Sequence, residues 1–243
     1  MLLTVDVGNT KTAIAVWSSG EAFGVRQAPT HEVRDWVKWV AEGGAEITEV
    51  MLASVVPAAV PQWEAVANVL GASFFALSGT NAPGLRVEVD DPAAVGPDRL
   101  ANVLGALDWG PGAWVAVGFG TATIVDLVHP DGRFVGGAIA PGAATALRAL
   151  VERTARLPEV PLVVPPRAIG RSTVEAMQAG ALLGHAAMVD ALVARMENEA
   201  GVPVRCVATG GLATRIARAC TRVNTIDPLL TLRGLRRASE LRQ

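Results

Sequence analysis

Two segments of the chain share one pattern, in which an apolar run leads into a turn of glycine and small residues and a second apolar run follows. The first is Val5-Asp6-Val7-Gly8-Asn9-Thr10-Lys11-Thr12, and the second is Val117-Gly118-Phe119-Gly120-Thr121-Ala122-Thr123. Each pattern predicts two strands joined by a tight turn. Glycine lets backbone N–H groups approach an anion closely, and Asn and Thr add short donors. The repeat therefore predicts two related half-domains that face one phosphate chain, as in nucleotide binding.

Asp6 distinguishes the first copy from the second. A carboxylate at this point would repel phosphate unless a cation lay between them, which makes Asp6 a candidate direct or water-mediated Mg²⁺ partner. An ordinary hairpin with Asp in its turn is the alternative interpretation, because motifs this short also arise by chance. The second copy at Gly120 and Thr121 favours the functional interpretation.

Length, charge and composition point to a cytoplasmic enzyme. The 243 residues suffice for one large or two modest domains, and a net charge of -2 gives no basic face for nucleic acid. The charge-free stretch 109–125 is interrupted by Gly and Pro, which argues against a membrane helix. Met1 leads directly into the expected strand 2–5, which leaves no room for a signal peptide. Two cysteines, Cys206 and Cys220, are too few for a disulfide framework or a tetrahedral zinc site.

The order of predicted elements indicates an α/β fold in two similar halves. Gly110-Pro111-Gly112 is the expected boundary, which gives half-domains 1–110 and 111–243. The first half is expected to contain strands 2–5, 13–17, 21–26, 49–56 and 72–77 and helices 35–42, 61–70 and 100–108. The second is expected to contain strands within 113–128, 133–139 and 204–208 and helices from 144, 172 and 229. Ser172 and Glu175 form an expected capping box, and Gly180 and Gly184 suit close packing of the long helix 172–198.

Gly96-Pro97-Asp98-Arg99 is the second candidate for chemistry. Asp98 is placed to take a proton from a substrate hydroxyl, and Arg99 to neutralise a carboxylate or phosphate. The simpler interpretation is an N-capping Asp beside a surface Arg. Two weaker signals are Ser172-Thr173, a candidate anion or hydroxyl contact at a helix start, and Thr209-Gly210-Gly211, against which a flat base could lie.

Taken together, these segments resemble the type III pantothenate kinases, a family of the acetate and sugar kinase/Hsp70/actin superfamily. The resemblance runs nearly end to end, and Gly-x-Asp-Arg and Gly-Arg-Ser-Thr are its most specific pieces. The matching segments are 6–10, 54–57, 96–99, 120–123, 136–142, 169–177, 209–211 and 230–235. The resemblance implies two ribonuclease H-like (actin-like ATPase) half-domains, each a mixed sheet flanked by helices, with the nucleotide cleft between them.

The resemblance also implies ATP- and Mg²⁺-dependent phosphorylation of pantothenate to 4′-phosphopantothenate, the first step of coenzyme A biosynthesis. Asp98 would accept the proton of the primary hydroxyl, Arg99 would bind the pantothenate carboxylate, and Asp6 would hold Mg²⁺ with ATP. The residues implied in ATP binding are Asp6, Val7, Gly8, Asn9, Thr10, Lys11, Thr12, Ala13, Gly120 and Thr121. Those implied in pantothenate binding are Val89, Gly96, Pro97, Asp98, Arg99 and Thr173. Family members are typically homodimers, and the helix from Thr173 is the candidate interface.

Two positions depart from the family pattern. Gly118 stands where the family usually has an Asp associated with a required monovalent cation (K⁺ or NH₄⁺). Val89 stands where the family tends to have a Tyr in the pantothenate pocket, and the chain contains no Tyr. These departures leave two alternatives: a catalytically impaired regulatory protein that binds nucleotide or pantothenate, and a kinase for a related hydroxy acid.

Overall fold

The chain divides into two compact units. A computed structural model describes residues 1–30, 39–40 and 44–242. The first unit comprises Met1–Trp109 together with Leu230–Gln243, and the second comprises Gly110–Leu229. The expected helix 35–42 lies mostly outside the described residues, and only Trp39 and Val40 are described there, as helical.

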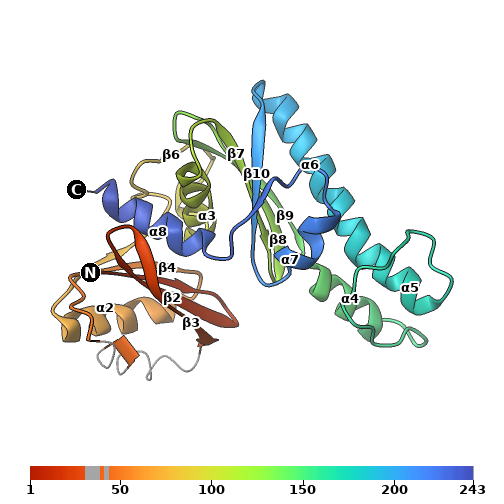
Figure 1. Cartoon of the computed structure of the whole chain (residues 1–243), viewed down its shortest axis with the longest axis horizontal. Helices are drawn as coiled ribbons and strands as arrows, with labels where there is room; N and C mark the ends of the chain where they lie inside the picture. Colours follow the sequence, from red (N-terminus) through yellow and green to blue (C-terminus); the bar gives the residue numbers. More distant parts are fainter. Residues whose placement is uncertain (31–38, 41–43, 243) are drawn as a thin grey trace. The chain divides into compact units, whose positions relative to one another are not determined.

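The first unit is built on a five-stranded mixed sheet of order β3-β2-β1-β4-β5 (Figure 1). Strands β1 (Leu2–Val7), β2 (Lys11–Ser18) and β3 (Glu21–Pro29) are antiparallel, as the hairpin pattern predicts. Strands β4 (Glu49–Ser54) and β5 (Ser73–Ala76) continue the sheet in parallel with β1. Because side chains alternate along a strand, this sheet presents two faces to be covered.

Helices cover both faces of that sheet. On one face, Trp63, Val66 and Ala67 of α2 (Val60–Leu70) join a core with alternate residues of β1, β2 and β4. On the other face lie α3 (Pro97–Asp108) and α8 (Leu230–Glu240). Figure 1 shows α2 and α8 on opposite sides of the strands. The remaining elements of the unit are short: η2 (Pro57–Ala59), β6 (Arg86–Val87) and η3 (Pro92–Ala94).

The pairing of α8 with α3 differs from the expected division, which placed residues 230–243 in the second half. Two glycines allow the two helices to approach closely, since a Cβ on Gly234 would lie 1.7 Å from the Ala101 carbonyl oxygen. Likewise, a Cβ on Gly105 would lie 2.2 Å from the Leu230 carbonyl oxygen. Asp108 at the end of α3 accepts hydrogen bonds from Arg236 (2.5 Å) and Arg237 (3.4 Å) of α8. Close apolar packing and these ion pairs therefore bind the last helix to the first unit.

The second unit repeats the sheet of the first. Its strands run in the order β11-β10-β7-β8-β9. Strands β7 (Ala113–Phe119), β8 (Ala122–Val128) and β9 (Arg133–Pro141) are antiparallel, and β10 (Val204–Thr209) and β11 (Thr225–Ile226) add in parallel. The prediction that the chain contains two similar α/β halves is confirmed.

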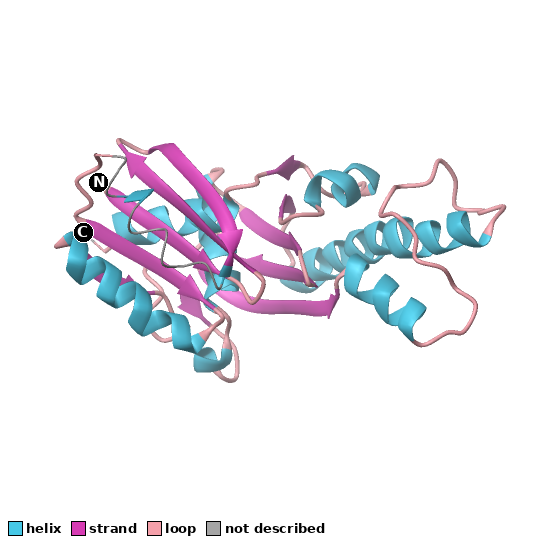
Figure 2. Cartoon of the chain, turned by 90° about the horizontal axis from the view of Figure 1, so that it is seen from below, coloured by secondary structure: helices cyan, strands magenta, loops and turns pink. Residues whose placement is uncertain are grey.

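Three helices of the second unit pack on one face of its sheet: α4 (Ala143–Glu152), α6 (Gly184–Ala200) and the short α7 (Ala213–Ile216), which η5 (Ala217–Ala219) follows. Helix α5 (Thr173–Gln178) lies beyond the strands, where its Met177 packs against Leu147 of α4 (Figure 2). Val189 and Val193 of α6 join the core formed by β7, β8 and β10. The expected single helix from 172 contains a π-helical turn, η4 (Ala179–Leu183), between α5 and α6.

The start of this long helix differs in one detail from the expected capping box. Ser172 accepts the Glu175 N–H (3.1 Å), as expected, but the Glu175 carboxylate accepts the Arg171 N–H (2.8 Å). By length and composition alone, the stretch Thr173–Ala200 would suffice to cross a membrane, and 39% of its most apolar window is buried in the protein. Core helices pass the same test, and the buried valines of α6 belong to the core of the second unit.

Candidate active site

The first glycine turn, residues 8–11, joins β1 to β2. The Gly8 N–H donates to the Lys11 carbonyl oxygen (2.9 Å), which closes the turn. A Cβ on Gly8 would lie 3.0 Å from that same oxygen, so the turn suits glycine. Asp6 lies two residues before it on β1, opposite Ala13 of β2, and is half-buried. Asn9, Thr10 and Lys11 are exposed. The turn therefore presents short polar groups to solvent beside a carboxylate held by the sheet.

Asp98 lies in the first turn of α3, after the N-cap residue Gly96. Pro97 at N1 suits this helix start because its missing N–H is not required there. The Asp98 Oδ1 accepts the Arg99 N–H (2.9 Å), and a Cβ on Gly96 would lie 2.6 Å from that oxygen. The local fold thus holds the Asp98 carboxylate against the backbone of its own segment, which explains why small Gly96 precedes it.

The first unit brings Asp6 and Asp98 near each other, although they are far apart in sequence. Burial, and then the negative charge of Asp98, raise the pKa of Asp6 from 3.8 to about 7. Burial also raises the pKa of Asp98, while the Arg99 N–H and the Arg99 guanidinium oppose that rise. Two neighbouring carboxylates with raised pKa values are typical of acid–base and metal sites. The site is therefore electrostatically suited to a cation or to a proton in transfer.

These carboxylates fit a divalent cation that is bound together with phosphate. Within residues 1–30, 39–40 and 44–242, no group of three or more His, Cys, Asp or Glu could hold a metal ion by itself. Mg²⁺ takes one or two carboxylates and completes its octahedron with water and phosphate oxygens. Asp6, with Asp98 beside it, meets that requirement. A cation would also relieve the repulsion between the two carboxylates.

The second glycine turn, residues 120–121, joins β7 to β8. The Gly120 N–H donates to the Ala122 carbonyl oxygen (3.0 Å), and the Gly142 N–H donates to the Thr121 carbonyl oxygen (2.9 Å). A Cβ on Gly142 would lie 2.2 Å from the Gly120 carbonyl oxygen, so the start of α4 rests directly on this turn. Thr121 is exposed. The second turn is thus held rigidly and leaves its threonine open to solvent.

Gly118 does not fit a monovalent cation site of the kind that the family resemblance implies. It lies on β7, opposite Ile124 of β8 and Thr209 of β10, and contributes no side-chain oxygen. Cations such as K⁺ require several oxygen ligands, and a carboxylate is absent from this position. The chain therefore lacks the ligand that the family pattern would place there.

The remaining expected substrate residues lie in different parts of the two units. Val89 is half-buried in the segment between β6 and η3 of the first unit. Thr173 is exposed at the start of α5 in the second unit, at an apolar cavity of about 480 Å³. That cavity is lined by Ala146, Leu147, Leu150, Leu157, Thr173, Ala176, Met177, Gly180, Ala181 and His185. Thr173 thus supplies a hydroxyl at the edge of an otherwise mainly apolar pocket.

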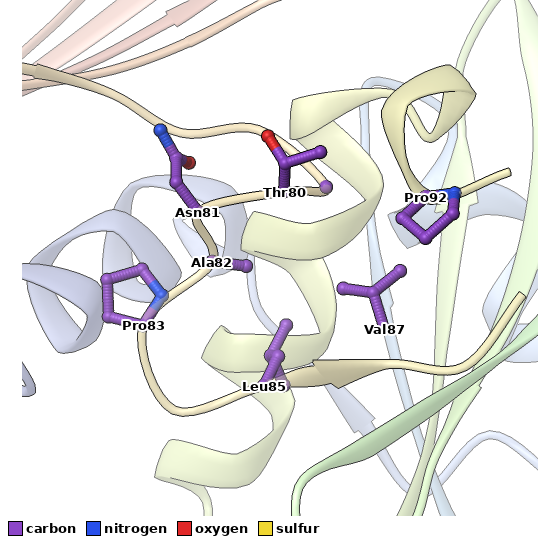
Figure 3. Close-up of a pocket in the computed structure, with 8 residues that line it drawn as sticks. Thr80, Asn81, Ala82, Pro83, Leu85, Val87 and Pro92 are labelled. Atoms are coloured by element: carbon purple, nitrogen blue, oxygen red, sulfur yellow. The ribbon is translucent and has the colours of Figure 1, made fainter.

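Another cavity lies in the first unit, about 590 Å³ in volume and lined by residues between Gly79 and Pro92 (Figure 3). Its lining residues are Gly79, Thr80, Asn81, Ala82, Pro83, Leu85, Val87 and Pro92, none of which is charged. The Asn81 amide is already engaged, because it accepts the Ser78 N–H and donates to the Ala76 carbonyl oxygen. Without a charged group, this cavity does not suit phosphoryl transfer.

Thr209-Gly210-Gly211 ends β10. Gly210 has a φ of +99°, and a Cβ there would lie 2.5 Å from the Phe119 carbonyl oxygen. Glycine is therefore required for local packing, whether or not a base lies against this segment. Two polar side chains that donate to carbonyl groups of the glycine turns, Thr30 and Thr145, were not found from the sequence because neither belongs to a recognisable motif.

The two units have the fold of the actin-like ATPases and sugar kinases. A protein from Campylobacter jejuni, described as a Baf family transcriptional activator, has a similar structure, with a TM-score of 0.65 and 18% identity over 98% of this chain and 97% of the other. A 2-dehydro-3-deoxygalactonokinase-like protein from Sinorhizobium meliloti has a TM-score of 0.60 and 15% identity, over 99% and 96% of the two chains. At these identities the likeness concerns the fold alone.

Sequence comparison gives the family. The profile of the type III pantothenate kinase family matches residues 2–195. A type III pantothenate kinase from Thermomicrobium roseum is 36% identical over 99% of this chain and 97% of its own length. The chain belongs to the type III pantothenate kinase family, and the family resemblance found in the sequence is confirmed.

Proposed function

We propose that this chain transfers the γ-phosphoryl group of ATP to the primary hydroxyl of pantothenate, giving 4′-phosphopantothenate and ADP in the first step of coenzyme A biosynthesis. Membership of the family supports the reaction. The observation that carries it to particular residues is that two carboxylates of the first unit, Asp6 and Asp98, both have raised pKa values, with Asp98 contributing to the rise at Asp6. Phosphoryl transfer requires just such charge control at the reacting oxygens.

Asp98 is the proposed proton acceptor. Its raised pKa makes it a stronger base than an exposed aspartate, and the Arg99 N–H fixes one of its oxygens. As the pantothenate oxygen attacks the γ-phosphorus, its proton passes to Asp98 and the bond from phosphorus to the β–γ bridging oxygen breaks. Arg99, beside it on α3, is proposed to bind the pantothenate carboxylate through its planar guanidinium. Thr173, Gly96, Pro97 and Val89 are the other proposed pantothenate contacts.

The two glycine turns are the proposed contacts for the ATP phosphates. In the first, the residues are Asp6, Val7, Gly8, Asn9, Thr10, Lys11, Thr12 and Ala13; in the second they are Gly120 and Thr121. Asp6 is the proposed protein ligand of Mg²⁺, directly or through water. When bound, Mg²⁺ supplies charge neutralisation on the transferred phosphoryl group. No monovalent cation is assigned to the chain, because Gly118 provides no ligand.

Assembly and location extend the proposal. We place the chain in the cytoplasm as a homodimer, with the helix from Thr173 as the interface. The exposed apolar residues Leu150 (43%), Val174 (37%) and Ile169 (82%) on and beside α4 and α5 support this assignment, because a second copy would remove them from water. Sedimentation of the purified chain tests it: a monomer at all concentrations would contradict the dimer.

The deciding experiment is ATP-dependent phosphorylation of pantothenate by the purified chain with Mg²⁺, with and without K⁺, beside Asp98→Asn. We expect turnover in the parent chain and a loss of kcat of about 10²–10⁴-fold in Asp98→Asn, the usual worth of a general base. Asp91→Asn is the matched control, since exposed Asp91 only caps η3 by accepting the Ala93 N–H (3.1 Å) and Asn retains that bond.

Each alternative has its own outcome. A folded protein that binds ATP or pantothenate without turnover under any cation condition would contradict the kinase assignment and mark a regulatory binding protein. Turnover of another hydroxy acid in preference to pantothenate would mark a kinase of different specificity, with the pocket around Val89 as the place to look for the cause.

A further inference from the structure

Thr30 holds the first glycine turn from outside every motif. It follows β3, and its hydroxyl donates to the Gly8 carbonyl oxygen (2.7 Å). Its own N–H donates to the Thr10 carbonyl oxygen (3.2 Å). The fully buried Thr12 hydroxyl in turn donates to the Thr30 hydroxyl (3.3 Å). One residue therefore engages two carbonyl groups of a four-residue turn.

The orientation of these carbonyl groups determines where the N–H groups of the turn point. In a trans peptide the C=O and the following N–H point in opposite directions. The Gly8 carbonyl is directed towards Thr30, so the Asn9 N–H is directed away from it. Neither the Asn9 nor the Thr10 N–H donates to any residue in the described part of the chain, and both residues are exposed. Two N–H groups are thus available for an anion.

The second glycine turn also has a carbonyl group held by a threonine hydroxyl, although a different peptide of the turn is held. The Thr145 hydroxyl, in the first turn of α4, donates to the Thr121 carbonyl oxygen (2.8 Å). The Gly142 N–H donates to the same oxygen (2.9 Å). The Thr121 N–H, which belongs to the preceding Gly120–Thr121 peptide, has no acceptor among the described residues, so fixing the Thr121 carbonyl limits rotation of this residue from its C-terminal side. The Thr121 carbonyl thus accepts two hydrogen bonds, from Thr145 and from the Gly142 N–H, whereas the Gly8 carbonyl accepts its side-chain hydrogen bond from Thr30.

We propose that Thr30 and Thr145 are positioning residues, whose hydroxyls hold one carbonyl of each glycine turn so that the N–H groups of the turns are directed at the ATP phosphates. The inference rests on the proposed function of the two turns in ATP binding. Neither threonine touches the phosphates. Each acts by preventing rotation of a peptide plane that would otherwise present an oxygen to an anion.

Isosteric substitution tests the proposal. Thr30→Val keeps the shape and the N–H bond to Thr10 but removes the hydroxyl, and Thr30→Ser keeps the hydroxyl. We expect Thr30→Val to raise the KM and the dissociation constant for MgATP about fivefold, the worth of one hydrogen bond, with the KM for pantothenate unchanged. Thr30→Ser restores ATP affinity. Thr145→Val gives a smaller change, because the Gly142 N–H still holds the Thr121 carbonyl.

Thr154→Val is the matched control. The Thr154 hydroxyl also donates to a backbone carbonyl, that of Leu150 (2.8 Å), but lies just after α4, at the opposite end of that helix from the second turn. It should leave ATP affinity unchanged. Should Thr30→Val fail to fold, Thr145→Val in the other unit decides the question by the same readouts.

The proposal is overturned if folded Thr30→Val and Thr145→Val bind MgATP as the parent does, or if both substrates' KM values change together and serine fails to restore them. The second result would mean that the threonines only maintain the fold. Failure of the parent chain to bind MgATP is a separate result: it would contradict the proposed function, and with it the premise of this inference.

Discussion

The two glycine turns occupy equivalent places in the two sheets, yet they differ in charge. Both join antiparallel strands next to a parallel one, and both have a carbonyl held by a threonine hydroxyl. The first has Asp6 two residues before its glycine, and the second has Gly118 in the corresponding position. The turn of the first unit therefore has an ionisable carboxylate beside it, while the turn of the second unit offers only neutral hydrogen-bond donors. The comparison teaches that a shared fold constrains backbone donors more than it constrains the ionisable groups beside them.

The comparison also extends to packing. The second turn is covered by Gly142 just before α4, where an added Cβ would lie only 2.2 Å from the Gly120 carbonyl oxygen. The first turn is held from its side by Thr30, and a Cβ on Gly8 would lie 3.0 Å from the Lys11 carbonyl oxygen. Adding a methyl group to a glycine should therefore destabilise the second turn more than the first. Removing a charged group should affect the first turn more, because only that turn has a carboxylate beside it.

Among changes that compare the two turns, Asp6→Asn should have the largest effect, and that effect is on catalysis. Removing the carboxylate should lower kcat/KM by about 10²–10³-fold, because the charge that would bind the cation on the phosphates is lost. Steady-state kinetics over a range of Mg²⁺ concentrations measures it. Equal activity of the parent and the variant would show that the two turns do not differ in charge chemistry.

The next effect is on stability and depends on pH. The folded-state pKa of Asp6, about 7, lies above its ordinary value of 3.8, so the native state binds the extra proton between these values. Native stability therefore falls as pH rises from about 4 through about 7. Asp6→Asn should raise the free energy of unfolding by up to about 4 kcal/mol at pH 8 and by only about 2 kcal/mol at pH 5.

Denaturation by urea at both pH values, without Mg²⁺, measures the difference. Asp91→Asn serves as the control, because it makes the same chemical change at an exposed position of the first unit. If Asp6→Asn and the parent differed in free energy of unfolding by the same amount at pH 5 and at pH 8, the pKa of Asp6 would not be raised in the native chain.

A third change concerns packing. Gly142→Ala should destabilise the chain by about 1–3 kcal/mol, because the added methyl group meets backbone that cannot move aside. Gly8→Ala, with a neighbour at 3.0 Å, should cost less. Thermal unfolding of both variants gives the comparison, and the reverse order would contradict the proposed difference in rigidity.

The smallest expected effect concerns monovalent cations. The parent chain should respond little to K⁺, and Gly118→Asp should lower the KM for ATP only a few-fold and only when K⁺ is present, on the order of one added ligand interaction. Titration of KCl against NaCl at constant ionic strength measures it. A strong K⁺ response of the parent would show that other oxygens complete a site without a carboxylate at 118.

The sequence predicted the hairpins of both halves, because two short apolar runs separated by glycine and small residues rarely form anything but two strands joined by a tight turn. It also identified Asp6 and Asp98, but not that they lie near each other: that depends on how α3 packs on the first sheet. The place of α8 could not be predicted for a similar reason, since it depends on two glycines, Gly105 and Gly234, that meet only in the fold.

Thr30 was equally inaccessible from sequence. Threonine at the end of a strand is common, and only the fold shows its hydroxyl at the Gly8 carbonyl. The π-helical turn at Ala179–Leu183 is a local departure that apolar periodicity does not distinguish from a regular helix, although Gly180 and Gly184 lie in and beside it. The local sequence pattern thus predicted the strands and most helices. The place of α8 and the role of Thr30 depend on contacts between residues far apart in the sequence, which that pattern does not contain.

The first unit is discontinuous along the chain, because Leu230–Gln243 belongs with Met1–Trp109. During synthesis, the second unit is therefore complete on the ribosome before the first has received its last helix. Until then α3 lacks the partner that covers Gly105 and neutralises Asp108, and the segment that bears Asp98 lacks its full support. The first unit can complete its fold only after α8 has left the ribosome, and a nonsense mutation at any point before residue 230 would leave this unit without its last helix.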